Sequence, residues 1–362
     1  MDSTTEDFRR RVRTFVNDQV RPHVDAWERD GAYPLELWRQ AGRAGLLSLG
    51  HSPEQLPDDP GALAVLVEEL TLGGAQGITM GLASHFVSLK AVQGADAAVA
   101  ARVVPAVLRG DRSIVLALTE PQAGSDLRAF ECRADADGEG GFRLTGDKRF
   151  ICNGGRADLL LVGALLDGAL ALFLVEGNAP GLGHTRLACL GWRSLPLSAL
   201  RFESTPARLL IHGREAGRLL QQCLQQERLN LAVMALASAE LALRDTVEHC
   251  RARRVGPEAL LDKSVLRQRL AERHSELTVA RVFVEQAVRW QAEGQLTAAR
   301  AAIAKNTAVD VLERVAHDAV QLHGAHGCVE PSRVERIYRD ARLLGIGGGA
   351  REVMLDIIGR TL

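Results

Sequence analysis

The chain has 362 residues, enough for two or three structural units that share a large buried core. Its 44 Lys and Arg residues against 45 Asp and Glu residues leave a formal net charge of −1, which gives no long-range field to attract nucleic acid or an acidic membrane surface. The six cysteines form no C-x-x-C pair, so the sequence suggests neither a zinc site nor a disulfide framework, and a reducing cytoplasm fits best. The N-terminal stretch MDSTTEDFRRRVRTFVNDQV has no apolar run, so no secretory signal or membrane span is expected there.

Three regions follow one another along the chain. From Phe8 to about Arg109, apolar residues recur at steps of three and four, the period of amphipathic helices. Between Ser113 and Ile211 the pattern changes to short runs such as SIVLAL and ALALFLVEG, separated by Gly, Asp and Asn, which predicts a sheet or barrel. From Ala216 long helical patterns return, and the run LNLAVMALASAELAL is apolar almost all round, as expected inside a helix bundle.

Three motifs carry candidate chemistry. The segment ALTEPQAGSD, residues 117–126, is a turn whose N–H groups and hydroxyls can hold a phosphate or a ring edge, although a plain structural turn is an equal alternative. The segment GFRLTGDKRFICNGGRAD, residues 141–158, ends in a tight glycine turn. The segment DAVQLHGAHGCVEPSRVERIYRDARLLGI, residues 318–346, carries His323 and His326 without a third spaced ligand, so packing or surface histidines are favoured and no metal is expected.

Taken together and in this order, these motifs resemble those of the acyl-CoA dehydrogenases over nearly the whole chain. TEPQAGSD is similar to the family's T-E-P-x-A-G-S-D, GDKRFICNGGRAD to G-x-K-x-x-I-T-N-G-x-x-A-D, and QLHGAHG with RIYRDA to Q-x-x-G-G-x-G and R-D-A. The resemblance implies an α+β, mostly α fold. Its expected parts are an N-terminal helical domain of residues 1–115, a middle β-barrel-like domain of residues 116–215 and a C-terminal four-helix bundle of residues 216–362.

The resemblance also implies FAD, held between the middle and C-terminal domains, as the group that carries the redox chemistry. The residues expected to contact it within one subunit are Leu116, Leu118, Thr119, Ser125, Phe150, Ile151 and Cys152. The residues expected to reach a neighbouring subunit's FAD are Arg253, Gln321, Gly324 and Ala325. The residues expected at the substrate are Ser125, Arg228, Gly348 and Gly349.

Four positions depart from the family pattern: the change at Cys152 predicts a different flavin potential or affinity, and the three lost contacts at the other positions predict weaker cofactor retention. Cys152 stands where a Thr or Ser usually bonds the flavin near N5, and a thiol is a weak donor. The family's R-x-x-F-G is reduced to RRVGP, so Arg253 is matched across a one-residue gap and the Phe is missing. Ser264 stands for a Gln and Ala350 for a Thr.

The catalytic base is the main question that the sequence raises. Its commonest position in the family, the Glu of I-Y-E-G-T, aligns with Gly348 in IGGGA. Members that resemble the long-chain and isovaleryl types place the base in a Q-E-R-L segment, which stands here as QQERLNLA and offers Glu227. Burial beside the apolar run that follows would raise the pKa of this carboxylate toward the range of a general base. The alternative interpretation is that Glu227 and Arg228 lie in the first turns of a helix and favour its macrodipole; Glu352 is interpreted as a helix charge.

These inferences predict an FAD-dependent α,β-dehydrogenase of an acyl thioester, with Glu227 removing the α-proton and the β-hydride passing to flavin N5. The thioester carrier is CoA or an acyl-carrier protein, the expected electron acceptor is an electron-transfer flavoprotein, and a homodimer or homotetramer is expected because the FAD site is shared. Two alternatives stay open. One is a flavin-dependent monooxygenase on the same fold, and the other is a catalytically lapsed flavoprotein-like partner subunit.

Overall fold

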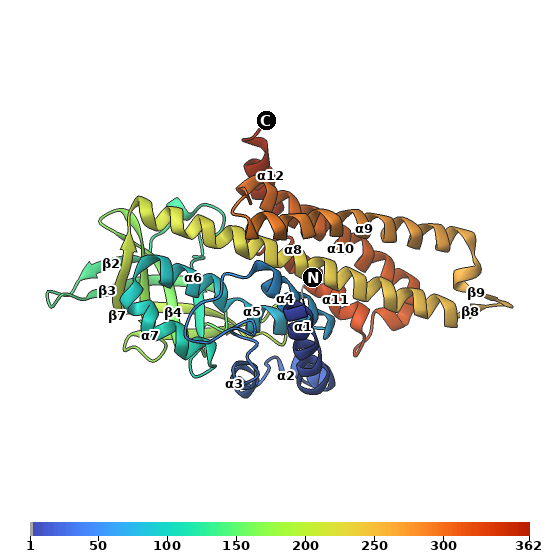
Figure 1. The fold of residues 1–362 in the computed structure, drawn as a ribbon, viewed down its shortest axis with the longest axis horizontal. Helices are drawn as coiled ribbons and strands as arrows, with labels where there is room; N and C mark the ends of the chain where they lie inside the picture. The colour runs from blue at the N-terminus through green and yellow to red at the C-terminus, as the bar shows by residue number, and fades with distance from the viewer. Residues whose placement is uncertain (1–2) are drawn as a thin grey trace.

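The computed structural model describes residues 3–362 and confirms the predicted order of helices, barrel and helices (Figure 1). The N-terminal helices pack around one apolar core that continues into the C-terminal bundle. These helices are α1 Ser3–Phe15, α2 Val24–Asp30, α3 Leu35–Arg43, α4 Pro60–Leu72, α5 Gln76–Ala83, α6 His85–Ala95 and α7 Ala97–Leu108, with short π and 3-10 turns at Val16–Val20 and Arg21–His23 between α1 and α2.

Within the described residues, seven strands form one sheet that closes on itself. They are β1 Ile114–Ala117, β2 Arg133–Ala136, β3 Phe142–Cys152, β4 Leu159–Leu166, β5 Ala169–Glu176, β6 Leu182–Leu187 and β7 Leu197–His212. The ring runs β4–β5–β7–β3–β2 and returns to β4 through a parallel pair between Arg133 and Leu165, while β1 and β6 are attached outside it. Buried side chains such as Phe173 and Phe202 fill its interior, so the barrel is a packed core.

The C-terminal region consists of long helices followed by a short one. The elements are α8 Arg214–Ala252, the hairpin strands β8 Arg254–Val255 and β9 Glu258–Ala259, α9 Ser264–Ala292, α10 Ala298–His323, α11 Arg333–Leu344 and α12 Arg351–Gly359. Helix α8 starts beside the barrel and runs the length of the bundle to the β8–β9 hairpin (Figure 1). It stays continuous because residues 218–252 contain neither Gly nor Pro and are rich in Ala and Leu.

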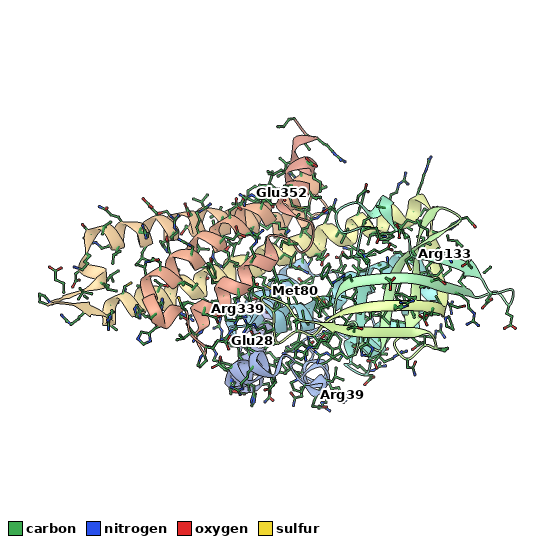
Figure 2. The ribbon with its side chains drawn as sticks, turned by 180° about the vertical axis from the view of Figure 1, so that it is seen from behind. Glu28, Arg39, Met80, Arg133, Arg339 and Glu352 are labelled. Carbon is green, nitrogen blue, oxygen red and sulfur yellow. The ribbon has the colours of Figure 1, made fainter. Side chains whose placement is uncertain are left out.

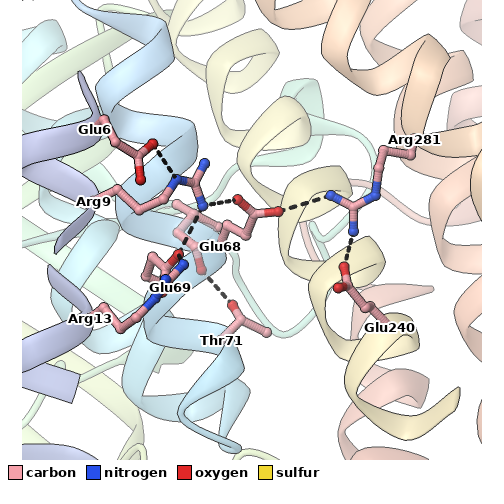
Figure 3. Close-up of polar contacts among 9 residues, drawn as sticks. Glu6, Arg9, Arg13, Glu68, Glu69, Thr71, Glu240 and Arg281 are labelled. Carbon is pink, nitrogen blue, oxygen red and sulfur yellow. Dashed lines mark hydrogen bonds and ion pairs between the residues drawn. The ribbon is translucent and has the colours of Figure 1, made fainter. Parts of the chain in front are cut away.

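A network of ion pairs joins the N-terminal helices to the bundle (Figure 3). Arg9 on α1 lies 2.6 Å from Glu68 and 2.8 Å from Glu69, both on α4. Glu68 is also 2.9 Å from Arg281 on α9, which pairs in turn with Glu240 on α8. Four helices that are distant in sequence are therefore held in one arrangement, and α8 keeps a fixed position relative to the rest of the molecule.

Candidate active site

A buried ion pair joins the first two motifs to each other. Lys148 of GDKRFICN lies 2.6 Å from Glu120 of TEPQAGSD, and both side chains are almost inaccessible to solvent, at 0% and 1% exposed. The Lys148 Nζ also donates to the Leu118 carbonyl at 2.7 Å and lies 3.8 Å from the centre of the Phe130 ring. Burial lowers the pKa of Lys148, while Glu120 favours its charged form. Sequence reasoning gave neither residue a role, although both stand inside the quoted motifs.

The same carboxylate organises the loop between β1 and β2. Glu120 accepts hydrogen bonds from the backbone N–H of Glu131 at 2.7 Å and of Cys132 at 3.2 Å. The Arg149 N–H donates to the Thr119 carbonyl at 2.7 Å, which places the first motif beside the end of β3. Thr119 and the segment that follows Arg149 therefore border one surface.

That surface has features that suit a flat ring system. Phe150 is 55% exposed and has a left-handed backbone conformation with φ 61°, which turns its ring out of the barrel. Thr119 and Cys152 are half-buried, and in the described part of the chain the Thr119 hydroxyl makes no hydrogen bond. An exposed aromatic ring beside a free hydroxyl fits the edge and face of a flavin, so these residues could hold FAD at this surface.

The other residues expected along the flavin take different environments. Ile151 is 3% exposed and lies within the barrel core, so only its backbone is available to a cofactor. Leu118 packs against Ala123 and Phe130 in a small cluster that reaches α8, with Leu116 at its edge. Ser125 is exposed in the loop and accessible to a ligand.

Glu227 lies well inside α8 rather than at its start. Helix α8 begins at Arg214, so Glu227 is in the fourth turn and the helix-start interpretation is wrong. The side chain is half-buried, and burial raises the pKa of the Glu227 carboxyl, against the lowering effects of Arg228 and Lys305. Burial, helped by Glu227 and then Cys189, raises the pKa of the Cys152 thiol to about 12. The carboxylate is therefore close enough to the end of β3 to act electrostatically on a residue of the expected flavin surface.

The glycine turn after α11 packs against the same face of α8. Gly348 and Gly349 have φ values of 66° and 102°, which side chains rarely adopt. A Cβ added to Gly348 would lie 2.3 Å from Leu231 Cδ1, one helical turn after Glu227. Arg228 Nε donates to the Gly348 carbonyl at 3.3 Å, and Lys305 Nζ donates to the Gly349 carbonyl. The two candidate base positions, one acidic and one glycine, thus border the same stretch of helix.

The R-D pair of the third motif holds three parts of the chain together. Asp340 Oδ1 accepts the Trp192 N–H at 2.7 Å, and Arg339 donates to the Leu190 carbonyl at 3.2 Å, which fixes the loop before β7. Arg339 also lies 3.8 Å from Glu28 on α2, and Figure 2 shows these two residues next to each other between the N-terminal helices and the bundle. Burial and the neighbouring Glu28 raise the pKa of Asp340 to about 7. Arg339 and Asp340 therefore connect α11, α2 and the loop before β7, and they lie outside the flavin surface.

Arg253, Gln321, Gly324 and Ala325 are exposed at the opposite end of the bundle from the barrel (Figure 1). The 26 residue-to-residue steps along α8 and its cap from Glu227 to Arg253 cover about 39 Å at 1.5 Å per step. Within one chain these four residues and Thr119 therefore do not form one compact site. Near them, the rings of His249 and His323 stack with centroids 4.2 Å apart.

A cavity of about 300 Å³ lies on another face of α8, lined by residues of α6, α8 and the loop before α4. Its lining includes Lys90, Gln222 and Gln226 but not Glu227. The chemistry argued above therefore lies at the flavin surface and not in this cavity. Glu352, on the projecting helix α12, is exposed and belongs to neither (Figure 2).

Residues 3–362 form neither a metal-binding cluster of their own side chains nor a membrane-spanning helix. No group of three His, Cys, Asp or Glu side chains there is placed to hold a metal ion. No helix in the described chain has the length and apolar character needed to cross a membrane.

Comparison with known proteins shows the family to which the fold belongs. Family models of the N-terminal, middle and C-terminal domains of acyl-CoA dehydrogenase match residues 2–111, 115–205 and 216–362. The long-chain specific acyl-CoA dehydrogenase of Sus scrofa mitochondria is 31% identical over 98% of this chain and 85% of that protein. The short-chain specific acyl-CoA dehydrogenase of Megasphaera elsdenii is 31% identical over 99% of this chain and 97% of that protein. A crystal structure of a putative acyl-CoA dehydrogenase from Mycobacterium smegmatis is 33% identical, with a TM-score of 0.93, over 100% of this chain and 98% of that one.

Fold and site together define a flavin-dependent oxidoreductase that acts on CH–CH donors. With all three domain models matched along its length, the chain belongs to the acyl-CoA dehydrogenase family, and its cofactor is FAD.

Proposed function

We propose that the protein removes two hydrogens from the α,β-carbons of an acyl thioester, with Glu227 as the base. The observation that carries the proposal is the half-buried Glu227 carboxylate on α8, next to Arg228, which donates to the Gly348 carbonyl of the glycine turn.

In this proposal, Glu227 takes the α-proton of the thioester. Its raised pKa makes the carboxylate a stronger base than an exposed glutamate, while the cations Arg228 and Lys305 keep it ionisable. When bound, FAD supplies the acceptor for the hydride that leaves the β-carbon. Thr119, Phe150 and Cys152 would hold the ring system, and Ser125, Arg228, Gly348 and Gly349 would line the thioester side.

The thioester carrier is CoA or an acyl-carrier protein, and an electron-transfer flavoprotein is the proposed oxidant. We infer a homodimer or homotetramer, because Arg253 and Gln321 lie far from Thr119 within one chain and could act on the same FAD only from a neighbouring subunit. The six cysteines are free thiols, which suits the cytoplasm proposed for the enzyme.

Two other functions of the same fold differ in what the site must contain. A flavin monooxygenase does not need a carboxylate over the substrate, and a lapsed partner subunit would not need to retain one. The half-buried carboxylate at Glu227 therefore favours the dehydrogenase.

The test is anaerobic mixing of the FAD-loaded protein with a panel of acyl-CoA and acyl-carrier-protein thioesters. A dehydrogenase bleaches the visible absorbance of its oxidised flavin with at least one of them. Oxygen uptake by the reduced protein together with hydroxylated product would instead identify a monooxygenase. No FAD uptake at all would support the lapsed subunit.

A further inference from the structure

Lys305 is a buried cation without a carboxylate partner in hydrogen-bond contact. It lies in the third turn of α10, is 0% exposed, and donates from Nζ to the Gly349 carbonyl. Among the described residues, it makes no ion pair within 4.0 Å. A buried ammonium group without such a pair is costly, so the fold must derive a benefit from the charge or from the bond to Gly349.

The bond to Gly349 belongs to a two-point attachment of the glycine turn. Arg228 on α8 holds the Gly348 carbonyl and Lys305 on α10 holds the Gly349 carbonyl. The turn lies so close to α8 that a Cβ at Gly348 would meet Leu231 at 2.3 Å and would lie 4.0 Å from Lys305 Cε. Each of these carbonyls accepts one hydrogen bond and carries no net charge, so Glu227 is the anion that acts on both cations.

The groups that act on Glu227 come from each element packed around it. From α8 these are Arg228 and the Cys223 thiol, from β3 the Cys152 thiol, and from α10 Lys305. Burial raises the pKa of the Cys223 thiol to about 11 and that of the Cys152 thiol to about 12, so both are neutral near pH 7. Arg228 and Lys305 are thus the charges that oppose the effect of burial on Glu227, and Lys305 is the one supplied by another helix.

We propose that Lys305 is a positioning residue for the base: it fixes the glycine turn against α8 and places a positive charge beside Glu227 that keeps this carboxylate ionised in a desolvated site. The significance for catalysis rests on the proposed function, because only then is Glu227 the base. The electrostatic relation itself is independent of activity. Burial lowers the pKa of Lys305 to about 8, against the effect of Glu227, so the device weakens as the ammonium loses its proton above that pH.

The experiment measures the Glu227 carboxyl directly. Protein labelled with ¹³C at the Glu side-chain carboxyl is titrated by NMR, and the Glu227 signal is assigned by its absence from Glu227→Gln. The variant Lys305→Gln keeps a donor for the Gly349 carbonyl and removes the charge. The variant Lys305→Arg keeps the charge, and Lys305→Met removes both.

Lys305→Gln is expected to raise the titration midpoint of Glu227 by about one pH unit, the lower end of what a nearby opposite charge causes. Lys305→Arg is expected to leave the midpoint close to that of the wild type. If the proposed function also holds, flavin reduction by Lys305→Gln at pH 6 falls up to about tenfold and recovers at higher pH, since one pKa unit is a factor of ten in the ionised fraction.

An unchanged midpoint in a folded Lys305→Gln variant overturns the proposal, whatever the activity. If that variant does not fold, the wild type provides the test, because the Glu227 signal should show a second inflection near pH 8 as Lys305 deprotonates. A single inflection over the whole range overturns it as well. A shifted midpoint without any thioester oxidation would retain the inference and reject the proposed function.

Discussion

We predict that the ion pair between Glu120 and Lys148 stabilises the arrangement of strands that forms the flavin surface. Changing Lys148 to Met removes an ammonium group that is 2.6 Å from Glu120 and 2.7 Å from the Leu118 carbonyl, at a place without solvent. The Glu120 carboxylate keeps its two backbone donors but loses its counter-charge. Removal of one partner from a buried pair costs about 3 to 5 kcal/mol, a large part of the roughly 5 to 15 kcal/mol that stabilises a protein.

The assay is urea unfolding of Lys148→Met followed by circular dichroism and, separately, by FAD release. FAD should be lost at lower urea concentration than in the wild type, because Thr119 and Phe150 are positioned by the strands that this pair joins. The double variant Lys148→Met/Glu120→Gln should recover much of the loss, since an amide oxygen still accepts from the backbone and no charge is left buried.

Lys263→Met is the matched control, because it makes the same chemical change at a side chain that is 38% exposed and 3.6 Å from Glu258. Such exposed pairs contribute at most about 1 kcal/mol. If Lys148→Met lowers the free energy of unfolding no more than Lys263→Met does, the ion pair does not stabilise the flavin surface. If the double variant is as unstable as Lys148→Met, the cost comes from lost packing and not from the uncompensated charge.

Three further predictions follow from other parts of the site. Adding Gly348→Glu to Glu227→Gln should restore only a little activity, because the left-handed φ of 66° and the 2.3 Å distance from an added Cβ to Leu231 oppose any side chain there. Adding Leu231→Ala as well should restore more, because it makes room for the new Cβ. Equal activity with and without Leu231→Ala would contradict this. Thermal stability should fall as the pH rises from about 4 to about 7, because the pKa of Asp340 is about 7 in the folded protein and about 3.9 in the unfolded chain, so the native state holds a proton that the unfolded chain releases. Asp340→Asn should reduce that fall, and an unchanged dependence of stability on pH would refute the assignment. Val255→Phe, at the exposed position where the family's aromatic is missing, should tighten FAD retention in gel filtration at sub-micromolar protein, and should do so only in the oligomer.

The sequence allowed the order of domains and the candidate base to be predicted, for physical reasons that are local. Periodicity changes where the backbone changes from helix to strand, and QQERL directly precedes an apolar run that had to be buried. The helix-start alternative for Glu227 failed because α8 begins at Arg214 after a glycine with φ 74°, without a capping side chain that would mark the start. Helix starts without such a cap leave little trace in a sequence.

The partners of the site could not be predicted, because they come from distant segments. Lys305 is 78 positions from Glu227, and its only signal is a single cation within the alanine-rich stretch AAIAKNTAV. Glu28 and Asp340 come close only where α2 and α11 pack together, and the sequence of neither helix indicates that contact. Such contacts depend on tertiary packing, which periodicity does not encode.

The most direct test of Glu227 as the base is single-turnover flavin reduction by Glu227→Gln. The change is nearly isosteric and removes only the group that accepts the α-proton, so FAD should remain bound and the native fold should be retained. With a thioester that reduces the wild-type flavin, the account predicts a rate lower by about 10² to 10⁴-fold, the usual contribution of a general base. Reduction of the Glu227→Gln flavin at the wild-type rate would contradict the account and show that the α-proton leaves to another group.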